Sequence, residues 1–450
     1  MKIEKLLLLS VSIALVAASC TSSTQVTTTD PVPGPTTTQA ASTTTTQVAD
    51  TTVPGDDGPD PAVVAALKAQ IEELIDITED LRGLEFIRRP EVVVLTVEQT
   101  AARVREDIEE ELDPVSLAVD DRMFRLLGMM GPDDALAEIY PELYAEQVAG
   151  FYDGDTQELV IAGDSDELSP LTKSVVVHEL IHALTDQYFG FHDQMVELSD
   201  ADGRSEDVAA LQALVEGDAT YFQFLYLQQL SVLEQVAMLA EAQEVPTDVL
   251  DAAPEFLSES LGFPYTTGMI FVQNLIDLGG SVALDTAYGA VPATTEQIIH
   301  PERYRTGEGA SIVEDAQVTL DGWELQITDT LGEWGLNLLL LGSISRGNRV
   351  VVTNGWGGDS YSVYYTDDQI AFVFSYVGDS EDDASEVTQA LIDHTRNTLA
   401  LGEGVSDGGG QLWEVDGRYA FIDRAGDGLV YILSTDIDAG RSIRSQVSAP

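Results

Sequence analysis

Cysteine and basic residues are scarce in this 450-residue sequence, and each scarcity excludes a class of site or partner. Because Cys20 is the only cysteine, the chain can form neither an intrachain disulfide nor a cysteine-ligated metal site. Lysine and arginine number 21 against 78 aspartates and glutamates, which gives a formal net charge of −57. A surface this acidic repels phosphate groups, so we expect neither nucleic acid nor anionic lipid headgroups as partners.

The acidity has two explanations that the sequence leaves open. It suits a saline exterior or cationic substrates, because a strongly charged surface keeps a protein soluble and attracts ions of the opposite sign. Solvation and habitat explain the same composition without any effect on specificity, and this is the simpler interpretation. The oligomeric state also stays open.

The N-terminal apolar run, Leu6–Ala18, is shorter than a membrane-spanning helix requires. It follows two lysines and ends in small residues, so residues 1–19 are predicted to be a secretory signal peptide. Ala17-Ala18-Ser19-Cys20 resembles a bacterial lipobox, in which Cys20 becomes the lipidated first residue. The expected location is the extracytoplasmic face of the cell membrane, through a lipid anchor at Cys20. Cleavage by ordinary signal peptidase would instead give a secreted protein.

Composition divides the rest of the chain. Residues 20–60 are dominated by Thr, Ser, Pro, Asp and Gly, which predicts a disordered tether that lifts a domain off the membrane. The roughly 390 residues beyond it have ordinary hydrophobic content, enough for one large domain or two moderate ones. We expect a first domain over residues 61–309 and a C-terminal α+β region over residues 310–450.

Two of the five histidines lie four residues apart, in His178-Glu179-Leu180-Ile181-His182. On a helix this spacing puts both imidazoles on one face, where they can reach one cation with Glu179 beside it. Chance would give such a pattern on the order of 0.005 times in this composition. Ser169 and Pro170 suit the start of that helix as N-cap and first helical residue. The motif predicts a zinc hydrolase, and the alternative is a helix with two solvated or core histidines.

A catalytic zinc ion needs a third protein ligand and an open position for water. The metzincin pattern requires Gly at 185 and His at 188, where this chain has Thr185 and Tyr188, so that class is excluded. His192 follows His182 by ten residues and could reach the metal only through a tight reversal of the chain.

Glu216 is the better candidate for the third ligand. It lies on a predicted helix from about Ser205 to Leu230, and a buried carboxylate is costly unless it is paired or bound to a metal. Small Gly217 and Ala219 beside it would let this helix approach the histidine helix closely. The alternative is an exposed glutamate on an acidic helix.

Two segments of the chain together resemble the gluzincin group of zinc metallopeptidases. They are His178-Glu179-Leu180-Ile181-His182 and Glu216-Gly217-Asp218-Ala219. The narrower resemblance is to uncharacterised bacterial and archaeal proteins with an H-E-L-x-H-A-L-x-D-Q helix and a later E-G-D-A helix. It covers roughly residues 150–309. It implies one zinc ion per chain on His178, His182 and Glu216, with Glu179 as general base. Thermolysin-like enzymes usually have Asp where this chain has Thr220, so Asp186 or Asp218 is expected to support the ligands instead.

The expected reaction is hydrolysis of peptides or proteins outside the cell by a zinc-activated water, whose proton Glu179 accepts. A further donor to the oxyanion is expected from His300, Tyr304 or Tyr265. One alternative is a non-catalytic lipoprotein that binds zinc or a partner, although such a protein has no need of Glu179. Another is a hydrolase of a different amide, such as a cell-wall peptide.

The predicted fold class is α+β, with a mainly helical zincin-like metallopeptidase domain that contains a small sheet, followed by the C-terminal α+β region. A hairpin is predicted over residues 150–162, just before the histidine helix. Tight turns are predicted around Tyr265 and over Gly355–Asp359. In the C-terminal region a helix is expected at about 383–401, with strands at 349–353, 361–365, 371–377, 412–415, 420–422 and 430–433.

Overall fold

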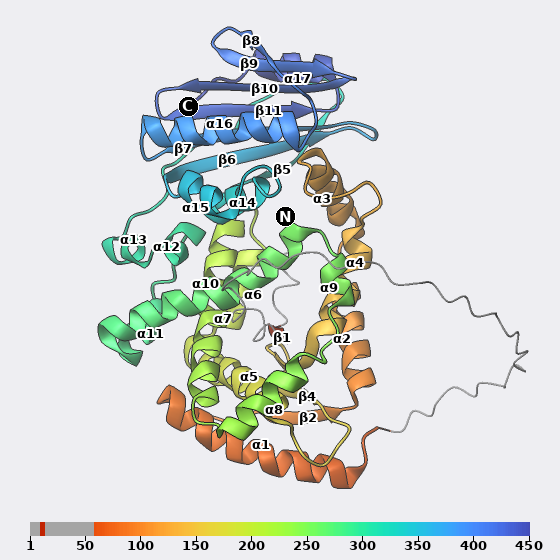
Figure 1. Ribbon diagram of the computed structural model, residues 1–450, viewed down its shortest axis with the longest axis vertical. Helices are drawn as coiled ribbons and strands as arrows, with labels where there is room; N and C mark the ends of the chain where they lie inside the picture. Colours follow the sequence, from red (N-terminus) through yellow and green to blue (C-terminus); the bar gives the residue numbers. More distant parts are fainter. Residues whose placement is uncertain (1–9, 14–57) are drawn as a thin grey trace, which may run out of the picture.

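The computed structural model describes residues 10–13 and 58–450, which form a mixed α+β protein (Figure 1). The predicted lipidation site at Cys20 and almost all of the predicted signal peptide and tether lie outside the described residues. The α+β class is confirmed. Among the described residues no helix has both the length and the apolar character that a membrane crossing requires.

The first region is mainly helical. Its elements in chain order are β1 (Ser10–Ile13), α1 (Pro61–Arg82), β2 (Glu91–Leu95), α2 (Val97–Glu111), α3 (Pro114–Leu126), α4 (Leu136–Gln147), β3 (Val148–Asp153), β4 (Glu158–Ala162), α5 (Pro170–Phe189), α6 (Phe191–Ser199), α7 (Ser205–Leu227), α8 (Val232–Ala242), α9 (Asp248–Ala252), α10 (Glu255–Gly279), α11 (Ser281–Tyr288), α12 (Thr295–Ile299) and α13 (Pro301–Thr306).

A small sheet in the order β1-β3-β4-β2 lies beside α5 in this region. β3 and β4 form the predicted antiparallel hairpin, while β2 runs parallel to β4. β1 pairs with the other side of β3 in the antiparallel sense, with Ser10 opposite Tyr152 and Val11 opposite Phe151. The outer side of β3 therefore accepts an extended chain through main-chain hydrogen bonds.

The C-terminal region is built on a seven-stranded antiparallel sheet in the order β5-β6-β7-β11-β10-β9-β8, drawn in blue at the top of Figure 1. Its elements are β5 (Glu324–Asp329), α14 (Gly332–Leu339), α15 (Arg346–Thr353), β6 (Trp356–Tyr365), β7 (Ile370–Gly378), α16 (Glu381–Asn397), β8 (Val405–Asp407), β9 (Gly410–Val415), β10 (Arg418–Ala425), β11 (Gly428–Ser434) and α17 (Ile437–Arg444).

Two of the predictions for this region are wrong. The residues predicted as a strand at 349–353 end helix α15, where Arg349 and Thr353 are buried four residues apart while Val350 and Val351 are exposed. That periodicity is helical. The turn predicted over 355–359 is instead mostly strand β6. A Cβ on Gly358 would lie 2.3 Å from the Ser311 carbonyl oxygen, so glycine allows the two backbones to approach.

The helical region and the C-terminal region share one apolar core. Phe124 of α3 and Leu257 of α10 belong to the same buried cluster as Trp356 and Phe374 of the C-terminal sheet. α14 and α15 lie between the sheet and the long helices below it in Figure 1. Packing therefore fixes how the two regions sit relative to each other.

Helices α7 and α10 approach each other through glycine. A Cβ on Gly217 would lie 2.3 Å from the carbonyl oxygen of Gly268, and one on Gly268 would lie 2.1 Å from that of Ala213. The sequence predicts that Gly217 brings α7 close to the histidine helix α5. This prediction is wrong, because the helix that approaches Gly217 is α10. The glycine faces α10, which then holds α7 from behind.

Gly217→Ala and Gly268→Ala are each expected to destabilise the fold by about 2–3 kcal/mol, because the added methyl group meets backbone that cannot move independently. Gly262→Ala is the matched control, since it lies on the same α10 with no atom within 4 Å of an added Cβ. It should raise stability by roughly 0.5–1 kcal/mol. Urea unfolding followed by circular dichroism measures all three. A Gly217→Ala midpoint equal to that of the wild type would contradict the close helix crossing.

Candidate metal centre

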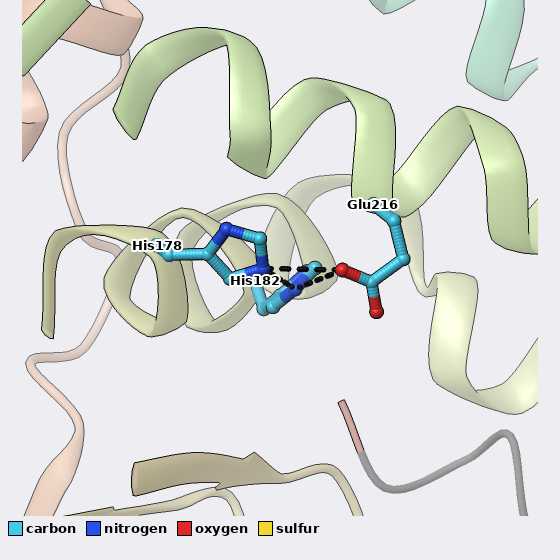
Figure 2. Close-up of side chains that lie close together, drawn as sticks. All are labelled: His178, His182 and Glu216. Carbon is cyan, nitrogen blue, oxygen red and sulfur yellow. Dashed lines mark hydrogen bonds and ion pairs between the residues drawn. The ribbon is translucent and has the colours of Figure 1, made fainter. Parts of the chain in front are cut away.

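Three side chains from two helices converge at one buried point (Figure 2). His178 and His182 come from α5 and Glu216 from α7. The Oε2 atom of Glu216 lies 3.1 Å from Nε2 of His178 and 3.3 Å from Nε2 of His182, and the two Nε2 atoms are 3.0 Å apart. Each of these side chains is at most 3% exposed. The residues predicted as metal ligands are thus brought together.

Helix α5 begins and ends where the sequence indicates. The hydroxyl of Ser169 accepts the backbone N–H of Thr172 at 3.1 Å, and Pro170 occupies the first turn. Gly190 ends the helix at a φ of 60°, a left-handed conformation that glycine adopts without strain. The middle of α5 is buried on every side, so the helix that carries both histidines is held by the surrounding core.

The geometry of the three atoms fits a metal ion. In a tetrahedral zinc site with Zn–N bonds of about 2.05 Å, neighbouring ligand atoms lie about 3.3 Å apart. The three separations observed here, 3.0–3.3 Å, are close to that value. Two imidazole nitrogens and one carboxylate oxygen are also ligand types that zinc accepts. The group can therefore hold a metal ion, and its ligands come from two rigid helices.

Electrostatics within the cluster favour an ionised Glu216. Burial alone would raise the pKa of its carboxyl group, but His182 and His178 outweigh burial and lower this pKa to about 2. Nδ1 of each histidine is buried without a hydrogen-bond partner in the described part of the chain. The expectation that Asp186 or Asp218 supports the ligand rings is therefore wrong for the described residues. Glu216 is in the charged form that a cation requires.

Glu179 lies beside the cluster and is completely buried. Its carboxylate accepts the backbone N–H of Tyr152 in β3 at 2.8 Å. Tyr152 is also the residue opposite Ser10 on the outer side of β3. One hydrogen bond therefore joins the residue between the two histidines to the side of β3 that pairs with β1.

Tyr265 lies at the cluster, and its ring stacks on that of His178 with centroids 5.9 Å apart. Its hydroxyl donates to Glu216, and burial together with the charges of Glu216 and Glu179 raises the pKa of Tyr265 well above its usual value. The turn predicted around this residue is wrong, because Tyr265 lies in the middle of α10. The helix continues through Pro264, although proline removes one helical hydrogen bond.

The other two candidates for an oxyanion donor have partners elsewhere. The hydroxyl of Tyr304 donates to the carbonyl oxygen of Ala290 at 2.7 Å. Nε2 of His300 lies 3.0 Å from a carboxylate oxygen of Glu333, which belongs to α14. Of the three residues that the sequence offers, only Tyr265 contacts the His-His-Glu cluster.

His192 and Asp186 organise the turn after α5. Nε2 of His192 lies 3.0 Å from Asp155, and His192 is outside the cluster. Asp186 accepts the His192 backbone N–H at 3.0 Å and the Tyr152 hydroxyl at 2.9 Å. These contacts tie β3 to the end of α5, so Asp186 supports the hairpin that holds Glu179.

Asp218, two residues after Glu216, takes part in a buried ionic network. It accepts hydrogen bonds from the Arg82 guanidinium at 3.1 Å and from the Tyr288 hydroxyl at 2.9 Å. Arg82 also donates to Asp285 at 2.7 Å. Burial raises the pKa of Asp218, and Arg82 opposes that shift. Sequence reasoning missed Arg82 and Tyr288, because only the tertiary fold brings α1 and α11 against α7.

Comparison with known proteins identifies part of the C-terminal region. Residues 320–443 match a family described as a Domain of unknown function (DUF8575). No curated protein and no solved structure matches the chain. The matched segment contains α14 and the large sheet, whereas the His-His-Glu cluster lies entirely before it.

Metal binding gives a direct test of the cluster. We expect the chelator-treated protein to take up one zinc ion per chain, and Glu216→Ala to weaken zinc binding by more than about 100-fold because a ligand is lost. His192→Ala should bind zinc as the wild type does. Equilibrium dialysis with zinc measured by mass spectrometry tests both variants. Undiminished affinity in Glu216→Ala would exclude this residue as a ligand.

Proposed function

We propose that the chain is an extracytoplasmic zinc-dependent peptidase whose helical region is a zincin-like domain of the gluzincin type. One observation carries the proposal. A fully buried carboxylate, Glu179, lies between two histidines that can share a metal ion and accepts a backbone N–H from strand β3. A site that only stored metal would have no use for a carboxylate held beside the ligands, so this arrangement supports hydrolysis over the non-catalytic alternative.

The residues divide the chemistry among them. A zinc ion held by His178, His182 and Glu216 would supply a lowered water pKa and polarisation of the substrate carbonyl. Glu179 accepts the proton of the attacking water as its oxygen bonds to the carbonyl carbon. The same carboxyl group then delivers that proton to the amine nitrogen as the C–N bond breaks.

The Tyr265 hydroxyl is the proposed donor to the oxyanion. A tyrosine hydroxyl has an ordinary pKa of about 10, so it is protonated at neutral pH and can donate a hydrogen bond. In the resting site that hydrogen bond goes to Glu216. If the Tyr265 hydroxyl donates to the developing oxyanion in place of Glu216, it stabilises the transition state more than the bound substrate. The reason is that the oxyanion carries more negative charge than the substrate carbonyl.

The edge of β3 is the proposed binding site for the peptide main chain. The antiparallel pairing of β1 with β3 illustrates the hydrogen bonds that an extended peptide would make there. Tyr152 joins this edge to Glu179, so a peptide bound along β3 would present its backbone next to the general base. Secretion through residues 1–19 and a lipid anchor at Cys20 would bring this site to extracellular peptides.

Glu179→Gln tests the general base. We expect kcat to fall roughly 100- to 10,000-fold with zinc content unchanged, because the amide keeps the shape but cannot accept the proton. Exposed Glu167→Gln should behave as the wild type. Chelator-sensitive cleavage of a peptide library, read by mass spectrometry, measures the rates. Stoichiometric zinc without cleavage in the wild type would refute the peptidase proposal and favour a binding function.

Tyr265→Phe tests the oxyanion donor. Loss of one such hydrogen bond is expected to lower kcat about 100-fold while KM changes little. Tyr304→Phe is the matched control, since its hydroxyl bonds to the Ala290 carbonyl away from the cluster. Steady-state kinetics on the best library peptide separates kcat from KM. An equal loss of kcat in both variants would show that Tyr265 is not the oxyanion donor.

A further inference from the structure

A cavity of about 230 Å³ lies between the helical region and the C-terminal region. Helices α3, α4, α7 and α10 form one side, and α14 with β6 forms the other. Most of its lining is apolar, including Phe124, Leu257, Trp334 and Leu338. Among the described residues of the lining, Glu206 alone bears a carboxyl group, which already accepts the backbone N–H and the hydroxyl of Thr295.

The cavity adjoins the metal centre through two tyrosines. Tyr265 lines the cavity, and its ring stacks on His178 while its hydroxyl bonds to Glu216. Tyr144 lines the cavity as well, and burial together with the charge of Glu216 raises the pKa of its hydroxyl. A group bound in this cavity would therefore lie directly behind the residues that contact the reacting centre.

We propose that this cavity receives a bulky apolar side chain of the peptide substrate, and that α14 of the C-terminal region forms its outer wall. The inference rests on the proposed peptidase function and gives it a substrate class. It also gives the matched domain a role in this chain, because α14 lies within residues 320–443.

The size of the cavity defines what fits. A dry apolar cavity of about 150 Å³ is enough for a benzene ring. The space here, about 230 Å³, accommodates an aromatic or long aliphatic side chain, and an alanine side chain would leave most of it empty. Without charged groups free to pair with a ligand, the lining offers little to a Lys, Asp or Glu side chain. The preference is therefore for large apolar residues.

The wall that α14 supplies is held firmly against the helical region. The Trp334 ring stacks on Phe263 of α10 with centroids 4.6 Å apart and an interplanar angle of 19°. The Trp334 backbone N–H donates to the Thr295 hydroxyl at 3.2 Å. Because both contacts cross between the two regions, the width of the cavity is set by how the C-terminal region packs on α10 and α12.

The test measures binding without turnover. Zinc-loaded Glu179→Gln protein is titrated calorimetrically with acetyl-Ala-Ala-Phe-Ala-Ala-amide and with the all-alanine version of the same peptide. We expect the phenylalanine peptide to bind at least about 10-fold more tightly, the discrimination typical of an apolar pocket. Adding Ala209→Phe, which fills the cavity from α7, should abolish that difference.

A second variant and a control distinguish a change in the cavity from a loss of binding caused by misfolding. Leu338→Ala enlarges the cavity from α14 and should shift the preference from Phe toward Trp at the same peptide position. Ile312→Ala removes an exposed apolar side chain that does not line the cavity and should change nothing. Circular dichroism confirms that each variant is folded before titration.

Equal affinity for the two peptides, or no measurable binding of either, would overturn the inference. A preference for Phe that survives both cavity variants would overturn it too. Failure of the peptidase proposal gives a different result, namely no cleavage by the zinc-loaded wild type. Because the titration uses a variant that does not need to cleave, its outcome can be judged separately from that failure.

Discussion

The burial of Glu216 against two histidines is the constraint on which the helical region depends. A carboxylate removed from water is costly unless positive charge or hydrogen-bond donors compensate for it. Here the compensation comes from α5 and, when bound, from a cation, so α5 and α7 must keep a fixed distance. α7 is held from behind by the crossing of Gly217 with Gly268, and from below by the ion pair of Asp218 with Arg82. Helices α1, α7 and α10 therefore act together with α5 to hold one buried carboxylate in place.

The sequence predicts the parts of this arrangement that are local. His178 and His182 are recognisable because four residues bring a helix back to the same face, and Ser169 marks the start of that helix by side-chain capping. Glu216 follows from the cost of a carboxylate among apolar neighbours. Contacts between distant segments have no comparable local signal. Tyr152 reaches Glu179 from a hairpin, and Arg82 reaches Asp218 across 136 residues, so neither was predicted as part of the site.

Errors in the predicted fold arise where tertiary packing overrides local preference. Pro-Tyr-Thr-Thr-Gly favours a turn, yet α10 continues through it because α7 packs along that helix. A valine-rich segment favours a strand, yet residues 349–353 stay helical, with the Arg349 guanidinium donating to Asn337 of α14 at 3.2 Å. Glycines at 357 and 358 favour a turn, but their missing side chains admit neighbouring backbone into a continuous strand. In each case the deciding partner lies outside the local sequence.

The contrast between the surface and the interior bears on how the proposed enzyme selects substrates. A surface with a net charge of −57 would raise the local concentration of positively charged ligands. Such an effect acts on encounter and weakens with salt. The cavity behind Tyr265 is lined mainly by apolar side chains, and the one carboxylate in it is already bonded to Thr295. Discrimination at the reacting centre would then depend on the size of an apolar side chain. The acidity then needs no role in specificity, which the proposed pocket would set where the two regions meet.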